Sequence, residues 1–281
     1  MMHRSTHTFL ILGGLGVLAL ITGFLLFGAT TAIILLVFGG FIALAVPGTS
    51  AHAQLRGVQP LRYHQAPELY DMVAALARSA GLSRSPALYL AQNGVLNAAT
   101  VGSAQSASII VTTGLLRRLS TREIYAVLAH ELSHVANEDL TLFRFAEALR
   151  QAVNIFVRVG WLLVIFALPV VLATGTLTGS AILALLGAPI AATLLQAALL
   201  RTREFEADRT AAELTGDPEG LAQALSRIEY VQENTLRMML PVSRQSHPLF
   251  RTHPPTRERV QRLLAAAGAQ RGGFTRRPVL G

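Results

Sequence analysis

Apolar residues fill the N-terminal part of the chain. No charged residue occurs from Phe9 to Val46, and a helix needs about 20 apolar residues to cross the hydrocarbon core of a bilayer. We therefore expect residues 9–46 to form a transmembrane helical hairpin with its turn at Gly28-Ala29-Thr30. A cleaved signal peptide is the alternative, but the apolar part of such a peptide has only about 7–15 residues.

Two more apolar segments, Val159–Thr174 and Ala181–Leu200, are separated by an uncharged turn sequence. They predict a second transmembrane hairpin over residues 153–200. The first of these segments is short and has Arg158 at its edge. A helix that lies partly in the membrane interface is therefore the alternative for this segment.

The basic residues predict how these segments are oriented. All 24 are arginines; they lie before, between and after the two hairpins, and neither hairpin turn contains one. Because positive residues favour the cytoplasmic side, we expect a multi-pass protein of the inner cell membrane with both termini and residues 47–152 in the cytoplasm. The formal net charge of +8 then reflects arginines that flank the membrane, so we expect the lipid bilayer as a partner and no nucleic acid.

The regions outside the hairpins have the pattern of one globular domain in two parts, 47–152 and 201–267. Only 14% of all residues are charged, against roughly 25% in ordinary soluble proteins, so we expect a protein of the bilayer. Its predicted helices make it a mainly α membrane protein. Short apolar runs at Ala87–Ala91 and Ala107–Thr112 predict a small β-sheet. The predicted helices of the domain cover 67–80, 120–136, 217–233 and 256–267, and the helix of the last span is expected to continue through Glu204 and Asp208. The Gly- and Arg-rich tail, 268–281, is predicted to be disordered and basic.

The helix that a Ser-x-x-Glu capping box begins at Ser120 contains the candidate chemistry. Its residues 130–134 read His-Glu-Leu-Ser-His, and a spacing of four places His130 and His134 on one face, where both imidazoles can bind one metal ion. Glu131 lies beside the coordination position that remains open. Because the chain has no cysteine, any metal must be bound by His, Asp or Glu.

A catalytic zinc normally has three protein ligands and one water, so a third ligand is required. Glu204 and Asp208 are one helical turn apart and share a face, whereas Glu206 points elsewhere. One of the two acids would bind the metal and the other would orient a ligand, and their spacing does not say which. The alternative is that these acids only pair with neighbouring arginines on a solvated helix.

Several motifs in the order found here closely resemble the HtpX-type heat-shock membrane proteases, which belong to the same broad family as the CAAX prenyl proteases. The matching segments are 108–116, 126–134, Asn137-Glu138-Asp139, the Arg-x-x-Glu-Phe-x-Ala-Asp sequence at 201–208 and Thr252-His253-Pro254-Pro255. The resemblance implies a zincin-like metalloprotease domain with one Zn²⁺ per chain. It also implies that Glu204 is the third zinc ligand and that Asp208 orients a zinc-binding residue.

The same resemblance implies roles for residues outside the HEXXH helix. Asn97 and Ala98 would lie by the cleft, where an extended polypeptide substrate adds as a strand. His253 would approach the site and stabilise either the oxyanion or the fold. On the HEXXH helix itself, the role of Glu131 follows from the chemistry of a metal-bound water: it would take a proton from the attacking water as general base.

We therefore expect a zinc metalloendopeptidase that cleaves misfolded or membrane proteins at the cytoplasmic face, in protein quality control. A non-proteolytic metal-binding membrane scaffold is one alternative, but it would not need Glu131 and the complete ligand set. A prenyl-protein processing protease is the other. Four candidate spans offer few helices to enclose the lipid chamber that such an enzyme requires.

Overall fold

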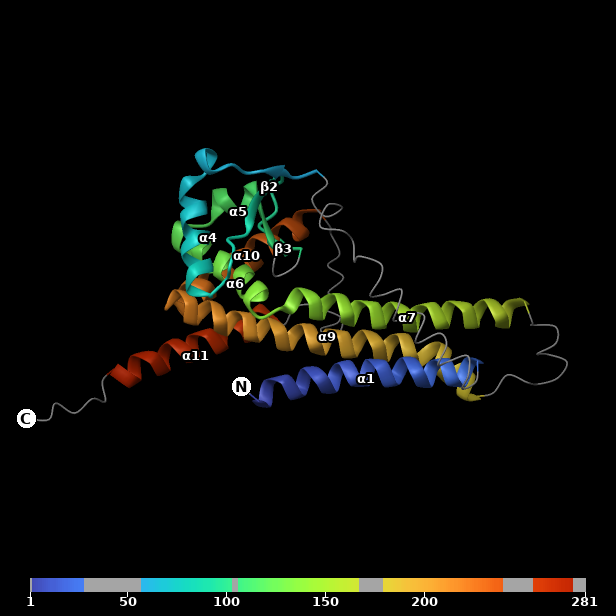
Figure 1. The fold of residues 1–281 in the computed structure, drawn as a ribbon. Helices are drawn as coiled ribbons and strands as arrows, with labels where there is room; N and C mark the ends of the chain where they lie inside the picture. Colours follow the sequence, from blue (N-terminus) through green and yellow to red (C-terminus); the bar gives the residue numbers. More distant parts are fainter. Residues whose placement is uncertain (1, 28–56, 103–105, 167–178, 240–254, 275–281) are drawn as a thin grey trace, which may run out of the picture. The chain divides into compact units, whose positions relative to one another are not determined.

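The computed structural model describes residues 2–27, 57–102, 106–166, 179–239 and 255–274 (Figure 1). The chain divides into two compact units. The first contains helix α1 (Met2–Phe27) and the greater part of two long helices, α7 (Asp139–Phe166) and α9 (Gly179–Thr215). The second contains the sheet, the remaining helices, the first two residues of α7 and the end of α9 from Thr202.

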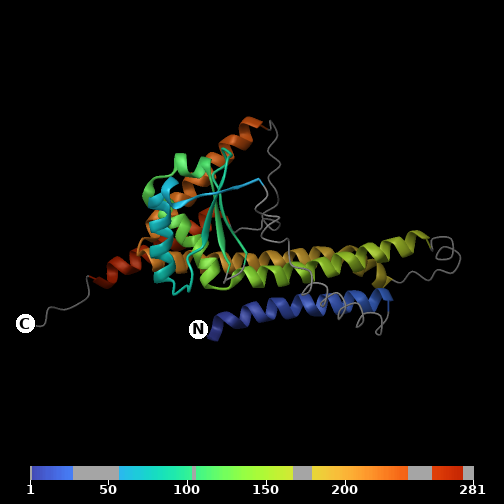
Figure 2. The same cartoon turned by 45° about the horizontal axis from the view of Figure 1, so that its top comes forward.

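Helices α1, α7 and α9 lie side by side in the first unit, as the two views of Figures 1 and 2 show. Their common core contains small and medium apolar side chains, among them Leu15, Val153 and Ala192, which are 0% exposed. Large apolar side chains instead face outward. Those more than half exposed are Phe9, Leu10, Val17, Phe24, Ile155, Leu162, Ile165, Leu183, Leu186 and Ile190. In a helical bundle in water, by contrast, the outward-facing side chains are mostly polar or charged.

Among the described helices, one has the length and composition needed to cross a membrane, the stretch Ile182–Thr215, with a mean hydropathy of 2.0 in its apolar window. The apolar stretch of α1, His7–Thr22, is shorter. The predicted turn at 28–30 and most of the turn at 175–180 lie outside the described residues, so the two hairpins stay a prediction.

Helix α9 continues from its apolar stretch through Glu204 and Asp208, as expected, and extends to Thr215. Helix α7 already begins at Asp139, so the expected boundaries at 152 and 200 fall inside continuous helices. The reason is local: no strong helix-breaking sequence separates the apolar stretch of either helix from its polar end. Pro189 is accommodated inside α9.

The second unit contains a four-stranded mixed sheet. Its strands are β1 (Gln59–Pro60), β2 (Ala87–Ala91), β3 (Ala98–Val101) and β4 (Ser108–Thr112), in the order β1-β2-β4-β3. Strands β2 and β4 are parallel, and the other two pairs are antiparallel. The small sheet expected from the apolar runs is therefore present, and β3 forms one of its edges.

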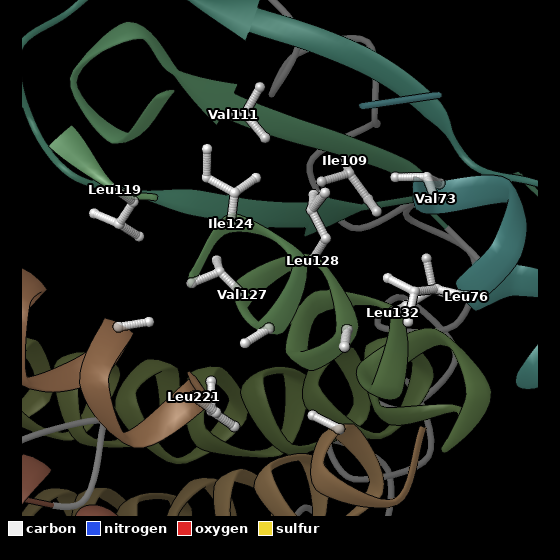
Figure 3. Close-up of a cluster of buried hydrophobic side chains, with 14 of the residues drawn as sticks. Val73, Leu76, Ile109, Val111, Leu119, Ile124, Val127, Leu128, Leu132 and Leu221 are labelled. Carbon is white, nitrogen blue, oxygen red and sulfur yellow. The ribbon is translucent and has the colours of Figure 1, made fainter. Parts of the chain in front are cut away.

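Among the described residues of this unit, the sheet is joined by the end of α9 and by helices α4 (Pro67–Ser79), α5 (Thr113–Arg118), α6 (Thr121–Ala136), α10 (Pro218–Met239) and α11 (Thr256–Phe274), with a short 3-10 turn, η1 (Tyr63–Gln65). Figure 3 shows Ile109 and Val111 of β4 directed toward Ile124 and Leu128 of α6, while Leu221 of α10 lies on the other side of α6. Helix α6 is thus buried between the sheet and α10, which holds the residues on it in fixed positions.

In the second unit, the start of α6 agrees with the sequence prediction and the end of α11 does not. At the start of α6, Ser120 and Glu123 form the predicted capping box, with the backbone N–H of Ser120 donating to Glu123 Oε2 at 2.7 Å. At the other end of the chain, α11 continues to Phe274, where a disordered tail was predicted from residue 268. Alanines at 265–267 favour helix over the effect of the glycines that follow.

Candidate metal centre

His130 and His134 lie one turn apart on α6, and their ring centroids are 4.9 Å apart. Glu204, on the part of α9 that belongs to the same unit, faces both rings. Each of the three residues is less than a tenth exposed, and each offers a ligand atom within 4.8 Å of the others. Among the described residues, these three form the group that can hold a metal ion.

Each histidine presents one ring nitrogen to Glu204 and the other to an aspartate. The Nε2 atoms of His130 and His134 lie 3.5 and 3.8 Å from the Glu204 carboxylate. The Nδ1 atom of His130 lies 3.1 Å from Asp208 Oδ1, and that of His134 lies 2.8 Å from Asp139 Oδ2. An aspartate that accepts a hydrogen bond from Nδ1–H stabilises the tautomer in which Nε2 carries no hydrogen. The lone pair of Nε2 can then bind a metal.

Glu131 is placed beside these ligands by its position in α6. Its Oε2 accepts a hydrogen bond at 2.9 Å from the hydroxyl of Thr100, on the edge strand β3. The same hydroxyl also lies 3.1 Å from the backbone carbonyl oxygen of Glu131. The edge strand and the HEXXH helix are therefore joined at the glutamate that follows the first histidine.

A buried arginine from α11 completes the site. Arg259 is 7% exposed. It donates from Nε and Nη2 to the two oxygens of Asp208 at 2.7 and 2.6 Å, and its Nη1 lies 3.2 Å from Glu204 Oε2. This bidentate geometry fixes the carboxylate plane of Asp208 and offsets the charge that the two acids bury together.

The electrostatics of the site favour binding of a positive charge at the His130 imidazole. Burial lowers the pKa of His130, but its hydrogen bonds with Asp208 and Glu204 outweigh burial and raise the pKa to about 10. The same two carboxylates attract a metal cation, which competes with the proton for the ring nitrogen.

The donor set fits zinc. Two imidazole nitrogens and one carboxylate oxygen are the three protein ligands of many catalytic zinc sites, in which a fourth position stays open for water. The described helices also supply the carboxylates of Asp208 and Asp139, which orient the two imidazole rings. Hard cations such as Mg²⁺ and Ca²⁺ prefer sites made of oxygen ligands. The nitrogen donors therefore favour zinc or another divalent first-row metal of the Mn²⁺ to Zn²⁺ series.

The structure brings most of the candidate site residues together. Asn97 and Ala98 lead into β3, where the backbone N–H of Asn97 donates to the Thr112 hydroxyl at 3.1 Å. Glu206 lies away from the ligand cluster, and its carboxylate is 3.6 Å from Arg203 Nη1. His253 lies outside the described residues.

Three residues of this centre were missed by the sequence reasoning: Asp139, Arg203 and Arg259. Asp139 had appeared only as part of a matching motif, and its spacing of five from His134 is not a helical one. The two arginines resembled the other arginines of the chain, and no local pattern set them apart. Their burial, at 11% and 8% side-chain exposure, is the property that distinguishes them.

A capped helix with the HEXXH spacing, a glutamate ligand from a second helix and aspartates behind both rings define the class of HEXXH metallopeptidases. Residues 63–267 match the model of Peptidase family M48. The chain belongs to this family, and the resemblance inferred from its motifs is confirmed.

Relatives similar to the chain along nearly its whole length include two from bacteria. A "Protease HtpX homolog" of Persephonella marina is 36% identical over 284 residues, covering 94% of this chain and 98% of that protein. A "Protease HtpX" of Legionella pneumophila is 33% identical, covering 94% and 99%. The crystal structure of S. mikatae Ste24p matches with 19% identity and a TM-score of 0.49, covering 93% of this chain and 64% of that one.

Proposed function

We propose that this protein is a membrane-bound zinc endopeptidase that cleaves misfolded or membrane-embedded polypeptides at the cytoplasmic face. The observation that carries the proposal is the convergence of both Nε2 atoms on the Glu204 carboxylate, with Glu131 next to the first histidine. His130, His134 and Glu204 would hold one zinc ion. When bound, zinc supplies a Lewis acid that activates water and stabilises negative charge on the substrate oxygen.

The remaining chemistry comes from side chains of this chain. Glu131 accepts a proton from the water as the water oxygen attacks the peptide carbonyl carbon, and it then delivers that proton to the leaving amine. The Thr100 hydroxyl holds one carboxylate oxygen of Glu131 in place. Asp139 and Asp208 keep the two imidazoles in the required tautomer and orientation.

The edge strand supports an extended polypeptide as substrate. Strand β3 pairs with β4 on one side, and no second strand of the described residues pairs with it. Its other side can therefore offer backbone N–H and C=O groups to a strand that adds to the sheet. Asn97 and Ala98 begin this strand, and Thr100 on it contacts Glu131. A substrate paired there runs past the residue that we propose as the proton acceptor.

The location at a membrane rests on the apolar outer surface of α1, α7 and α9 and on the stretch from Ile182. Glu204 follows Leu200, the predicted end of that span, by four residues of the same helix, which corresponds to about 6 Å. The zinc site would then lie near the membrane surface. Segments of damaged membrane proteins that emerge there are suitable substrates, which supports a role in quality control.

The proposed function is tested with the full chain purified in detergent. We expect about one zinc per chain and cleavage of an unfolded polypeptide such as casein. A chelator should abolish cleavage, and added Zn²⁺ should restore it. Cleavage that survives complete removal of the metal would contradict the proposal, as would a zinc-loaded chain that cleaves neither unfolded nor membrane polypeptides.

A further inference from the structure

Asp139 connects a candidate zinc ligand to an arginine on another helix. Its side chain is 0% exposed. One carboxylate oxygen, Oδ2, faces His134 Nδ1 at 2.8 Å, and the other, Oδ1, accepts a hydrogen bond from Arg203 Nε and forms an ion pair with its Nη2. The orientation of the imidazole therefore depends on a carboxylate whose own orientation is fixed by Arg203.

The turn that brings Asp139 back to His134 has an unfavourable backbone. Glu138, between the end of α6 and the start of α7, has a φ of 59°. This left-handed conformation is disfavoured for a residue with a side chain, and glycine or asparagine normally occupies such a position after a helix. The turn therefore requires contacts from elsewhere to stay in this form.

Arg203 makes contacts on both sides of that residue. It donates from Nη2 to the backbone carbonyl oxygen of Asn137 at 3.4 Å and bonds the Asp139 carboxylate. Asn137 precedes Glu138 and Asp139 follows it, so one guanidinium holds both flanks of the turn. Because Arg203 also precedes Glu204 directly, the same residue joins the two helices that provide the candidate ligands.

We propose that Arg203 is a positioning residue for the metal centre: it clamps the turn 137–139 so that Asp139 holds His134 with Nε2 directed at the cation. The inference rests on the proposed zinc site. Arg259 acts on Asp208 and His130 in a related way, but it also contacts Glu204 itself. Arg203 therefore offers the cleaner test, because its contacts reach the site through Asp139.

The test compares zinc affinity, measured by chelator competition, in full-length wild type, Arg203→Gln and Arg203→Lys. Loss of the partner of a ligating histidine typically weakens metal affinity by about 10–100-fold, and we expect Arg203→Gln to weaken it by at least about tenfold. Lysine keeps the charge but cannot hold both flanks of the turn, so Arg203→Lys should fall between wild type and Arg203→Gln.

Arg209→Gln is the matched control, because Arg209 lies on the same helix in an exposed pair with Glu213 at 3.4 Å. It should keep wild-type affinity. Asp139→Asn should weaken zinc binding as Arg203→Gln does, and the two changes together should weaken it by less than the product of their separate effects.

The results distinguish the positioning role of Arg203 from the proposed protease function. If Arg203→Gln binds zinc within twofold of wild type, Arg203 is not a positioning residue, whatever the activity. Should Arg203→Gln fail to fold, an Arg203→Lys protein whose zinc affinity equals that of wild type leads to the same conclusion. If the effects of Arg203→Gln and Asp139→Asn multiply independently, the clamp is also wrong. A wild type that binds zinc but never cleaves a polypeptide overturns the proposed function, and the affinity comparison still decides the role of Arg203.

Discussion

The hydroxyl of Thr100 lies 2.9 Å from Oε2 of Glu131, so the edge strand of the sheet contacts the HEXXH helix at its glutamate. The strand to which a polypeptide can add and the residue that would accept the proton are thus held in one geometry. A hydrogen bond to a charged group contributes about 1.5–3 kcal/mol, enough to affect the reaction rate.

Removing this hydroxyl should slow catalysis while zinc stays bound. Thr100→Val is close in shape to threonine, and we expect kcat to fall about tenfold, which corresponds to about 1.4 kcal/mol. Thr100→Ser should retain most of the wild-type rate because it keeps the hydroxyl. Steady-state cleavage of a peptide together with zinc content checks this. An unchanged kcat in Thr100→Val would show that the contact does not position Glu131.

The acidic residues of α9 should differ in the damage that their loss causes. Glu204→Ala leaves two protein ligands and should nearly eliminate both zinc retention and cleavage. Asp208→Ala removes the partner of His130 and should cost about 10–100-fold. Glu206→Ala should remain closest to wild type, because the Glu206 carboxylate faces Arg203 and does not belong to the ligand group.

Zinc retention under limiting metal measures this order. If Asp208→Ala loses the metal while Glu204→Ala keeps it, the roles of the two residues must be exchanged. If Glu206→Ala is the most damaged, the assignment of helix faces is wrong.

The sequence predicted the parts of the site that depend on local periodicity. Helix α6 could be recognised because a capping box and the four-residue spacing of His130 and His134 are both helical patterns. Glu204 and Asp208 were expected to share a face for the same reason, and both face the rings.

The parts that depend on tertiary contacts could not be predicted. Glu138 adopts a left-handed conformation without being glycine, so no turn signal indicated that Asp139 folds back onto His134. Arg259 reaches Asp208 from a helix 51 residues further along the chain. Only a structure distinguishes these residues from arginines and acids on a solvated surface.

Burial of α6 should make the site depend on core packing. Leu128 is 0% exposed and lies on the face of α6 that packs against the sheet (Figure 3). We expect Leu128→Ala to lower the free energy of unfolding by about 2–5 kcal/mol. Leu264→Ala, at a 48% exposed position on α11, should change it by less than about 0.5 kcal/mol. Thermal unfolding in detergent measures both, and equal shifts would contradict the proposed core.

The topology proposed from the arginines predicts that residues on both sides of the second hairpin are cytoplasmic. Reporter fusions after Arg62 and after Arg262 should therefore both indicate the cytoplasm. If the two reporters indicate opposite sides, the number of spans between them is odd and the second hairpin does not exist. If both indicate the outside, the orientation is reversed.

The central claim, that a metal-site glutamate performs the proton transfer of peptide cleavage, is tested most directly with Glu131→Gln. This change keeps the ligands His130, His134 and Glu204 but removes the proton acceptor. Zinc content and cleavage rate should be measured on the same purified sample, with Glu213→Gln, at an exposed position of α9, as control. We expect wild-type zinc in both variants and a rate lowered by about 10²–10⁴-fold in Glu131→Gln alone. A Glu131→Gln protein that carries zinc and cleaves at a near-normal rate would contradict the account.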